Sequence, residues 1–356
     1  MEFRSRKAGR GYRIFRKMNN WKYFGVLLLA LLSVPKGSHA QFTMAKTTDV
    51  AQVKSRQLIV LLDAASKKEK EKFAKKDKSN SSEALEKAYS DYNTTLESIV
   101  KKNWKLHDTF QTMQLDDFKA LDKNEKKKYV VIFCSSYDEA VYNNTFIPVD
   151  HLVLDPTTSR FAKSFTHPVF SVCPGEKLDQ KISSISPQIF SIDLPEDQPV
   201  GSALAFAVRL ANYFCTTGYQ YTIKSKSTYE IIARQNDYKL ATKTLLLRRD
   251  WMQPGLSEKE VQYLYRYPSK VVTVSEYDSL VVSGDPQYVY FVIIPKATMN
   301  MNNQNYISYY YLIADNQDGA LCAFYLPNMI LSKYKTQYDK TLLDDKTLKK
   351  IADTYH

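Results

Sequence analysis

The stretch Tyr129-Val-Val-Ile-Phe133 returns 159 residues later as Tyr288-Val-Tyr-Phe-Val292. Both are uninterrupted runs of β-branched and aromatic residues, which is typical of a strand buried on both faces. Two further pairs of segments match in the same order and at nearly the same offset: Phe118-Lys-Ala-Leu121 with Tyr277-Asp-Ser-Leu280, and Leu152-Val-Leu-Asp155 with Leu312-Ile-Ala-Asp315. Self-similarity at a nearly fixed offset is the trace of internal repetition. We therefore predict two homologous units that arose by duplication.

Each unit is expected to have the order strand-helix-strand-helix-strand-strand. In the first unit the elements are expected at 57–62, 83–103, 108–113, a short helix with Phe118 and Leu121, 128–134, and a hairpin that leads from His151–Leu154 into a turn at 155–159. In the second unit they are expected at 243–247, 257–265, 269–274, a short helix capped by Ser275, 287–294, and a hairpin from Tyr309–Ala314 to Leu321–Tyr325. Strands that alternate with helices predict parallel pairs joined by crossovers, to which the hairpin adds an antiparallel pair. The predicted fold class is α/β, with a mixed sheet in each of two tandem units and α+β as the alternative.

The N-terminal segment has the pattern of a cleavable secretory leader. An apolar run, Phe24–Val34, follows Lys22, and Ser38-His39-Ala40 places small residues before a cut between Ala40 and Gln41. The run is too short for a membrane span, which needs ~20 residues. Since the leader is complete from Met18 onward, we take Met18 as the expected start of translation. These features predict an exported protein that is periplasmic or extracellular.

The rest of the chain is expected to contain two units and a tail. The predicted segments are a first unit at 41–173 with a Lys-rich insertion at 66–82, a proline-rich linker at 174–200, a second unit at 201–331, and a C-terminal tail at 332–356 that ends in a helix at Asp345–Thr354. The nearly all-apolar helix Ser202–Cys215 is shorter than a membrane span. We therefore predict a buried core helix there, and no transmembrane span in the mature chain.

The charge distribution argues against a nucleic-acid partner. The whole chain carries a formal net charge of +12, but residues 1–40 hold nine Lys or Arg and one Glu, a net of +8, which leaves 12 − 8 = +4 for the mature chain. Nucleic-acid binding needs clustered cations that contact phosphates. The remaining dense patch, Lys67–Lys78, mixes lysines with acids and is typical of a solvated face.

The four cysteines, Cys134, Cys173, Cys215 and Cys322, all fall in the mature chain. An oxidising compartment allows one or two bridges among them, with connectivity open, and buried free thiols are the alternative. No glycine stands in a phosphate-binding G-x-G-x-x-G or G-x-x-x-x-G-K-[ST] arrangement. The sequence thus predicts no nucleotide cofactor, and no other cofactor either.

Candidate catalytic and metal-binding residues are few. His151 and Asp155 would share a strand face, and with His167 they could form a two-histidine, one-carboxylate metal site. The simpler interpretation is that Asp155 and its counterpart Asp315 cap hairpin turns. A Cys173–His167 pair lacks an evident third group, and the adjacent acids Asp116 and Asp117 are typical helix-start residues.

Tyrosine is abundant, with 26 residues in the chain and three in a row at Tyr309–Tyr311. Consecutive strand residues point to opposite faces, so one face can pack on the core while the other presents rings outward. Strand propensity in a packed core is one interpretation. An aromatic interaction surface, which would include Tyr306, is the other.

Three segments of the second unit carry a family resemblance: Lys243–Asp250, Ser269–Leu280 and Ala314–Ala320. In these segments the chain resembles the uncharacterised exported proteins common in Bacteroidota. The element order is also similar to that of the N-terminal domain of TolB-type envelope proteins. The resemblance implies a cell-envelope or secreted protein and no particular activity.

We therefore expect an exported, non-enzymatic protein that uses a groove or a sheet edge to bind an envelope or other protein component. The alternative is a periplasmic hydrolase or metal-dependent enzyme with its site between the two units.

Overall fold

A computed structural model of the chain describes thirteen stretches of residues. They are 42–44, 47–67, 69–71, 82–140, 145–149, 154–155, 160–161, 166–178, 189–195, 198–217, 226–301, 304–326 and 343–355. The predicted leader, with its cleavage site Ala40–Gln41, lies outside these stretches, as does most of the Lys-rich insertion.

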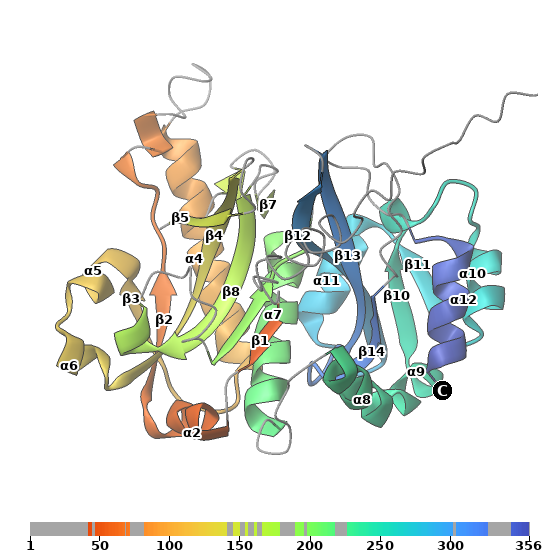
Figure 1. Cartoon of the computed structure of the whole chain (residues 1–356), viewed down its shortest axis with the longest axis horizontal. Coiled ribbons are helices and arrows are strands. Elements are labelled where there is room, and N and C mark those ends of the chain that lie inside the picture. The colour runs from red at the N-terminus through yellow and green to blue at the C-terminus, as the bar shows by residue number, and fades with distance from the viewer. Residues whose placement is uncertain are drawn as a thin grey trace, which may run out of the picture. The chain divides into compact units, whose positions relative to one another are not determined.

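The first sheet has the strand order β1-β9-β8-β4-β2-β3, and β5 pairs with part of β4 (Figure 1). Its strands are β1 (Phe42–Met44), β2 (Gln57–Leu62), β3 (Gln111–Gln114), β4 (Tyr129–Ala140), β5 (Thr145–Val149), β8 (Thr166–Pro174) and β9 (Phe190–Asp193). β2 is parallel to β3 and β4, whereas β8 and β9 continue the sheet antiparallel. The helices are α2 (Thr47–Ser55), α4 (Ser82–Asn103), α5 (Leu115–Ala120) and α6 (Lys123–Lys126).

The second sheet has the order β11-β10-β12-β13-β14. Its strands are β10 (Thr244–Arg248), β11 (Ser269–Val272), β12 (Tyr288–Met301), β13 (Gln304–Asp315) and β14 (Leu321–Tyr325). The helices around it are α8 (Lys226–Asn236), α9 (Tyr238–Thr242), α10 (Glu258–Tyr265), α11 (Val274–Ser283) and α12 (Asp345–Thr354). α12 has the bounds that the sequence predicts.

The two sheets have the same strand order and register. Gln57 pairs with Tyr129 in the first sheet as Thr244 pairs with Tyr288 in the second, and in both sheets a parallel strand, β3 or β11, lies on the far side of the first strand. The predicted α/β class with two mixed sheets is confirmed. The hairpin predicted from Tyr309–Ala314 to Leu321–Tyr325 is present as β13 and β14, whereas β9, which follows β8 in the first unit, was not predicted.

Local signals explain where the helices of the second unit begin. Ser257 and Glu260 form the predicted reciprocal capping box at the start of α10. The N-cap of α11 is Thr273, two residues before the predicted cap at Ser275, since the Thr273 hydroxyl accepts the hydrogen bond from the Glu276 N–H at 3.2 Å. α10 ends with Arg266 in the left-handed conformation, at a φ of 67°.

The predicted counterpart of β13 in the first unit is wrong. Val130 pairs with Pro174 of β8 as Val289 pairs with Asp315 of β13, so β8, and not residues 152–155, corresponds to β13. Leu154–Asp155 instead forms the short strand β6, which pairs with β7 (Arg160–Phe161) in a separate two-stranded sheet. The residues at 152–154 and 312–314 are similar in type because both segments are apolar. Such similarity between short apolar segments often arises by chance.

The segment predicted as a linker, 174–200, contains β9 and therefore part of the first sheet. It leads into α7 (Val200–Thr217), which contacts α4 and β9 of the first unit and α11 of the second. The chain from Ala40 to His356 forms a single compact unit. The linker is thus replaced by a strand and a helix that join the two sheets.

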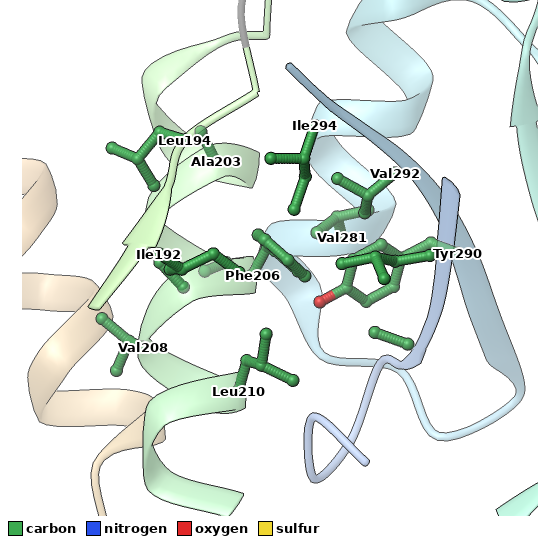
Figure 2. Close-up of a cluster of buried hydrophobic side chains, with 14 of the residues drawn as sticks. Ile192, Leu194, Ala203, Phe206, Val208, Leu210, Val281, Tyr290, Val292 and Ile294 are labelled. Atoms are coloured by element: carbon green, nitrogen blue, oxygen red, sulfur yellow. The ribbon is translucent and has the colours of Figure 1, made fainter. Parts of the chain in front are cut away.

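α7 is the buried core helix that the sequence predicts. Nearly every residue from Val200 to Cys215 is buried. Figure 2 shows Phe206 and Leu210 on the side of α7 toward Tyr290, and Val208 on another side, near β9. The rings of Phe206 and Tyr290 pack edge to face, with their centroids 6.3 Å apart. Among the described residues, no helix is long and apolar enough to cross a membrane.

Candidate functional site

The structure does not assemble the predicted metal ligands from described residues. Asp155 lies in β6 opposite Arg160, and His167 lies in β8 opposite Tyr137, while His151 is outside the described residues. The described part of the chain holds no group of three or more His, Cys, Asp or Glu residues that could bind a metal ion. His167 and Cys173 lie six positions apart along β8, about 20 Å at strand rise, too far for a catalytic pair.

None of the four cysteines forms a disulfide, and all four are buried. Cys134 and Cys173 belong to core clusters on opposite faces of the first sheet, so these two thiols cannot form a bridge. Burial raises the pKa of both Cys134 and Cys215 to about 12. Thiols with such a pKa are neutral at physiological pH and poor nucleophiles.

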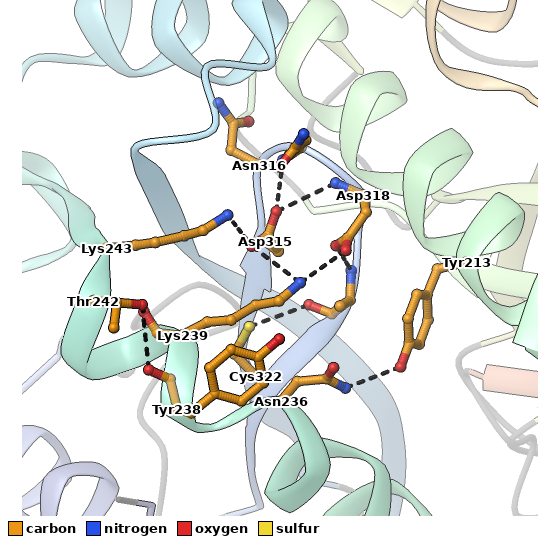
Figure 3. Close-up of polar contacts among 12 residues, drawn as sticks. Tyr213, Asn236, Tyr238, Lys239, Thr242, Lys243, Asp315, Asn316, Asp318 and Cys322 are labelled. Carbon is orange, nitrogen blue, oxygen red and sulfur yellow. Dashed lines mark hydrogen bonds and ion pairs between the residues drawn. The ribbon is translucent and has the colours of Figure 1, made fainter.

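The largest described group of buried charges lies at the turn between β13 and β14 (Figure 3). Asp315 is fully buried, and its carboxylate accepts hydrogen bonds from Lys243 and from the Gln317 N–H, the latter at 2.8 Å. Lys239 lies 3.3 Å from the same carboxylate and 2.8 Å from that of Asp318.

These contacts give Asp315 a structural role. Burial alone would raise the pKa of Asp315, but the Lys243 hydrogen bond and the Lys239 charge hold it below its usual value. The predicted capping of this turn by Asp315 is confirmed, since its side chain accepts from the backbone two residues on. Lys243 directly precedes β10, so the cluster lies at the amino end of that strand, whereas ligand sites of parallel sheets form at the carboxyl end.

A second buried group centres on Arg209 of α7. Its Nε donates to Asn103 Oδ1 of α4 at 2.7 Å, and its Nη1 donates to the Val281 carbonyl at 2.7 Å and to Asn316 Oδ1 at 2.8 Å. Gly319 contacts this arginine so closely that an added Cβ would lie 2.4 Å from the Arg209 carbonyl carbon. The guanidinium of α7 is therefore hydrogen-bonded to residues of both units.

The carboxyl ends of the first parallel strands carry equivalent acids, Asp63 after β2 and Asp250 after β10. The Asp63 backbone exchanges two hydrogen bonds with the Asn93 side chain, at 3.0 and 2.8 Å. Asp250 accepts two hydrogen bonds from Arg248, whose guanidinium lies 4.2 Å from the centroid of the Trp251 ring. These contacts are internal and reinforce the ends of β2 and β10 locally.

The outer edge strands of the two sheets differ in how far they are covered. The candidate site is sought among these edges. A strand edge presents backbone N–H and C=O groups that a partner's strand can pair with. In the second sheet the outer edge of β14 is closed by side chains. The Tyr355 hydroxyl donates to the Phe324 carbonyl at 2.6 Å and accepts from the Phe324 N–H at 3.2 Å, and Asn236 of α8 donates to the Leu321 carbonyl at 3.3 Å.

The corresponding strand of the first sheet, β9, is closed by another strand. β1 pairs antiparallel with it, with Phe42 opposite Ile192, Thr43 opposite Ser191 and Met44 opposite Phe190. β9 therefore has a strand on each side, and the outward backbone groups of Phe324 and Leu321 in β14 have side-chain partners.

At the other end, β3 is the open edge. Gln111, Thr112 and Gln114 are exposed, and within the described residues β3 pairs only with β2. Its counterpart β11 is half-buried beside α10 and carries Lys270, which pairs with Glu276 at 2.6 Å. Since charges on edge strands discourage pairing, uncharged β3 is the better acceptor of a partner strand.

The loop before β3 holds that edge in place. The Trp104 indole N–H donates to His107 Nδ1 at 3.0 Å, which leaves His107 Nε2 to donate to the Arg56 carbonyl at 3.0 Å. The Lys105 N–H donates to Asn212 of α7 at 2.7 Å. Because this edge is already ordered, little conformational entropy is lost there when a partner binds.

The tyrosine run does not supply an aromatic surface. Tyr309 and Tyr311 are buried and Tyr310 is partly buried, with ring contacts from Tyr310 to Phe324 and from Tyr311 to Phe291. The side chain of Tyr306 is outside the described set. Core packing is therefore the correct interpretation for Tyr309–Tyr311.

No family model, no curated protein and no solved structure matches the chain. The resemblance to exported Bacteroidota proteins and to TolB-type domains therefore stays a prediction from the sequence.

Proposed function

We propose that the chain is an exported, non-enzymatic protein that binds an envelope or secreted protein by adding a partner strand to β3. The observation that carries this proposal is the exposure of an uncharged edge in the first sheet, where the second sheet has a half-buried, charged one. The leader ending at Ala40 supports export. The buried ionisable groups around Asp315 and Arg209 support a structural use of charge and no catalytic one.

The expected affinity decides the kind of experiment. A strand of four residues turns about half of its backbone groups outward, and each net hydrogen bond is worth ~1 kcal/mol. The resulting few kcal/mol correspond to a Kd near the millimolar range before side-chain contacts are added, about 4 kcal/mol being 1 mM. A covalent capture in intact cells is therefore preferable to copurification.

A photo-crosslinking amino acid at Thr112 tests the proposal in the native host. We expect a discrete crosslinked product at Thr112 and none at the control position Tyr263 of α10, whose side chain is 82% exposed. Gln111→Lys should remove the product, because Gln111 has the register position of Lys270 in the second sheet. Equal products at Thr112 and Tyr263, or a product that survives Gln111→Lys, would exclude β3 as the binding edge.

A further inference from the structure

The N-terminal strand β1 closes the edge of β9 with very few contacts. Three residues pair, and the first of them, Phe42, is the second residue after the predicted cleavage site. The β9 residues opposite Phe42 and Met44 are Ile192 and Phe190, both fully buried in the core cluster that includes α7. An uncovered β9 would therefore expose both an apolar core edge and its backbone groups.

The second unit shows that this arrangement is particular to the first. Tyr355 and Asn236 close β14 from helical segments that follow and precede the sheet, and Tyr355 is itself 1% exposed. Leaving the edge would require Tyr355 to give up a buried position and Asn236 a half-buried one. β1 can leave β9 without moving any other described strand, because it pairs with β9 alone.

The point at which β1 can detach is well defined. After β1 only Ala45 and Lys46 precede α2. Just beyond the other end of α2, the Arg56 guanidinium forms two hydrogen bonds with the Glu176 carboxylate, at 2.5 and 3.1 Å, and a third with Gln52 at 3.0 Å. α2 is thus anchored to the first unit, and a two-residue connection joins it to a strand held by three pairs.

We propose that β1 is an exchangeable strand, and that the β9 edge of one copy takes the β1 strand of a second copy of this chain. The strand known to fit this edge is β1, and a second copy supplies an identical one in the same register. Reciprocal exchange creates a two-fold dimer that forms no new kind of contact and closes on itself. Short connections beside the exchanged element favour this route, because they limit how easily the strand folds back.

Two single-cysteine variants of the full chain test this proposal. Thr43→Cys and Ser191→Cys place thiols at directly paired positions, where the Cα separation of antiparallel strands suits a disulfide. The four native thiols are buried and do not compete. When the two preparations are mixed with a mild oxidant, we expect a disulfide-linked dimer of the two variants. While monomer predominates, its fraction should rise about tenfold for a tenfold rise in concentration, by mass action.

The control mixes Thr43→Cys with Thr112→Cys, which puts an exposed thiol on β3, and should give no such product. A chain carrying both Thr43→Cys and Ser191→Cys must form its internal bridge in dilute solution, which establishes that the pair can react. If that bridge forms but mixed variants give no joint product up to millimolar protein, β1 stays in its own chain and the proposal is wrong. Disulfide capture by Ser191→Cys of a peptide of residues 41–46 that carries Thr43→Cys, without capture of a second copy, would also overturn it. None of these results depends on β3 binding a partner.

Discussion

The first sheet closes its last strand with a strand, and the second closes its last strand with side chains. β1 satisfies β9 through backbone groups, which any extended segment of suitable register can replace. Tyr355 and Asn236 satisfy selected atoms of β14, and Tyr355 is packed into the core. The two units thus keep one strand order while differing at every outer edge. Sheet interiors are constrained by packing, whereas edges are free to acquire separate uses.

Asp315→Asn should cause the largest loss of unfolding free energy. The loss concerns a feature of the second sheet alone, because the first sheet has Pro174 at the matching position. Removing the carboxylate charge leaves Lys239 and Lys243 without it, and breaking a buried ion pair costs about 3–5 kcal/mol of unfolding free energy. Urea denaturation at pH 7 measures the loss. Asp318→Asn is the matched control, since Asp318 is half-exposed and its pair with Lys239 should be worth ~1 kcal/mol or less. Equal losses would show that the turn is not specially buried.

The same aspartate predicts an acid-dependent difference. The pKa of Asp315 is lower in the folded chain than the unfolded value of about 3.9. Its contribution is therefore fully present above about pH 4 and is lost as pH falls through the folded pKa. The unfolding free energy of the parent chain should fall more steeply below about pH 4 than that of Asp315→Asn. Parallel curves for the two chains would contradict this assignment.

Tyr355→Phe should have the next largest effect, because it opens the β14 edge without changing the ring. The Phe324 N–H and carbonyl would both lose a partner in a buried setting, at a cost of about 2 kcal/mol. Thermal or chemical unfolding measures the loss. Tyr267→Phe removes a long, part-buried hydrogen bond of 3.4 Å to the Tyr355 carbonyl and should cost less than half as much. If the two variants are alike, the Tyr355 hydroxyl does not close this edge.

Exchanging the charge between the open edges should change stability little. Gln111→Lys and Lys270→Gln alter surface side chains, so each should shift the unfolding free energy by no more than ~0.5 kcal/mol. Partner capture at β3 should nevertheless be lost in Gln111→Lys and kept in Lys270→Gln. A large loss of unfolding free energy in Gln111→Lys would contradict the exposed position of Gln111. The loss of the crosslinked product would then reflect unfolding and not the charge on the β3 edge.

The smallest expected effect is that of a reductant, which should leave the melting temperature unchanged. The cysteines of both units form no disulfide, so there is no bridge to reduce. A thiol reagent should label none of the four in the native chain and all four after unfolding. A melting temperature that falls with reductant would require a bridge that the structure lacks.

The central strands could be predicted because their signal is local. Tyr129–Phe133 and Tyr288–Val292 are long apolar runs, and Ser257 with Glu260 encodes a helix start within four residues. The Asp315 turn was predictable for the same reason. β8 was missed because two prolines and a histidine interrupt its pattern, although its central residues are fully buried.

The candidate site could not be predicted, because it depends on which strands end up outermost. The four-residue pattern of β3 has no apolar periodicity, and its exposure follows only from the sheet order. The closure of β14 links Phe324 to a tyrosine 31 residues away, and that of β9 links residues about 150 apart. Such pairings are set by long-range packing, which no local pattern records.

The position of α7 has a consequence for how the chain unfolds. Its residues complete the core of the first unit through α4 and that of the second through α11, and Arg209 bonds to both. Neither unit can lose α7 and keep a filled interior, so we expect the two units to unfold as one cooperative block. Amide protons of α7 should exchange only through global unfolding. Two sheets of the same strand order are thus expected to form a single thermodynamic domain, because one helix completes both cores.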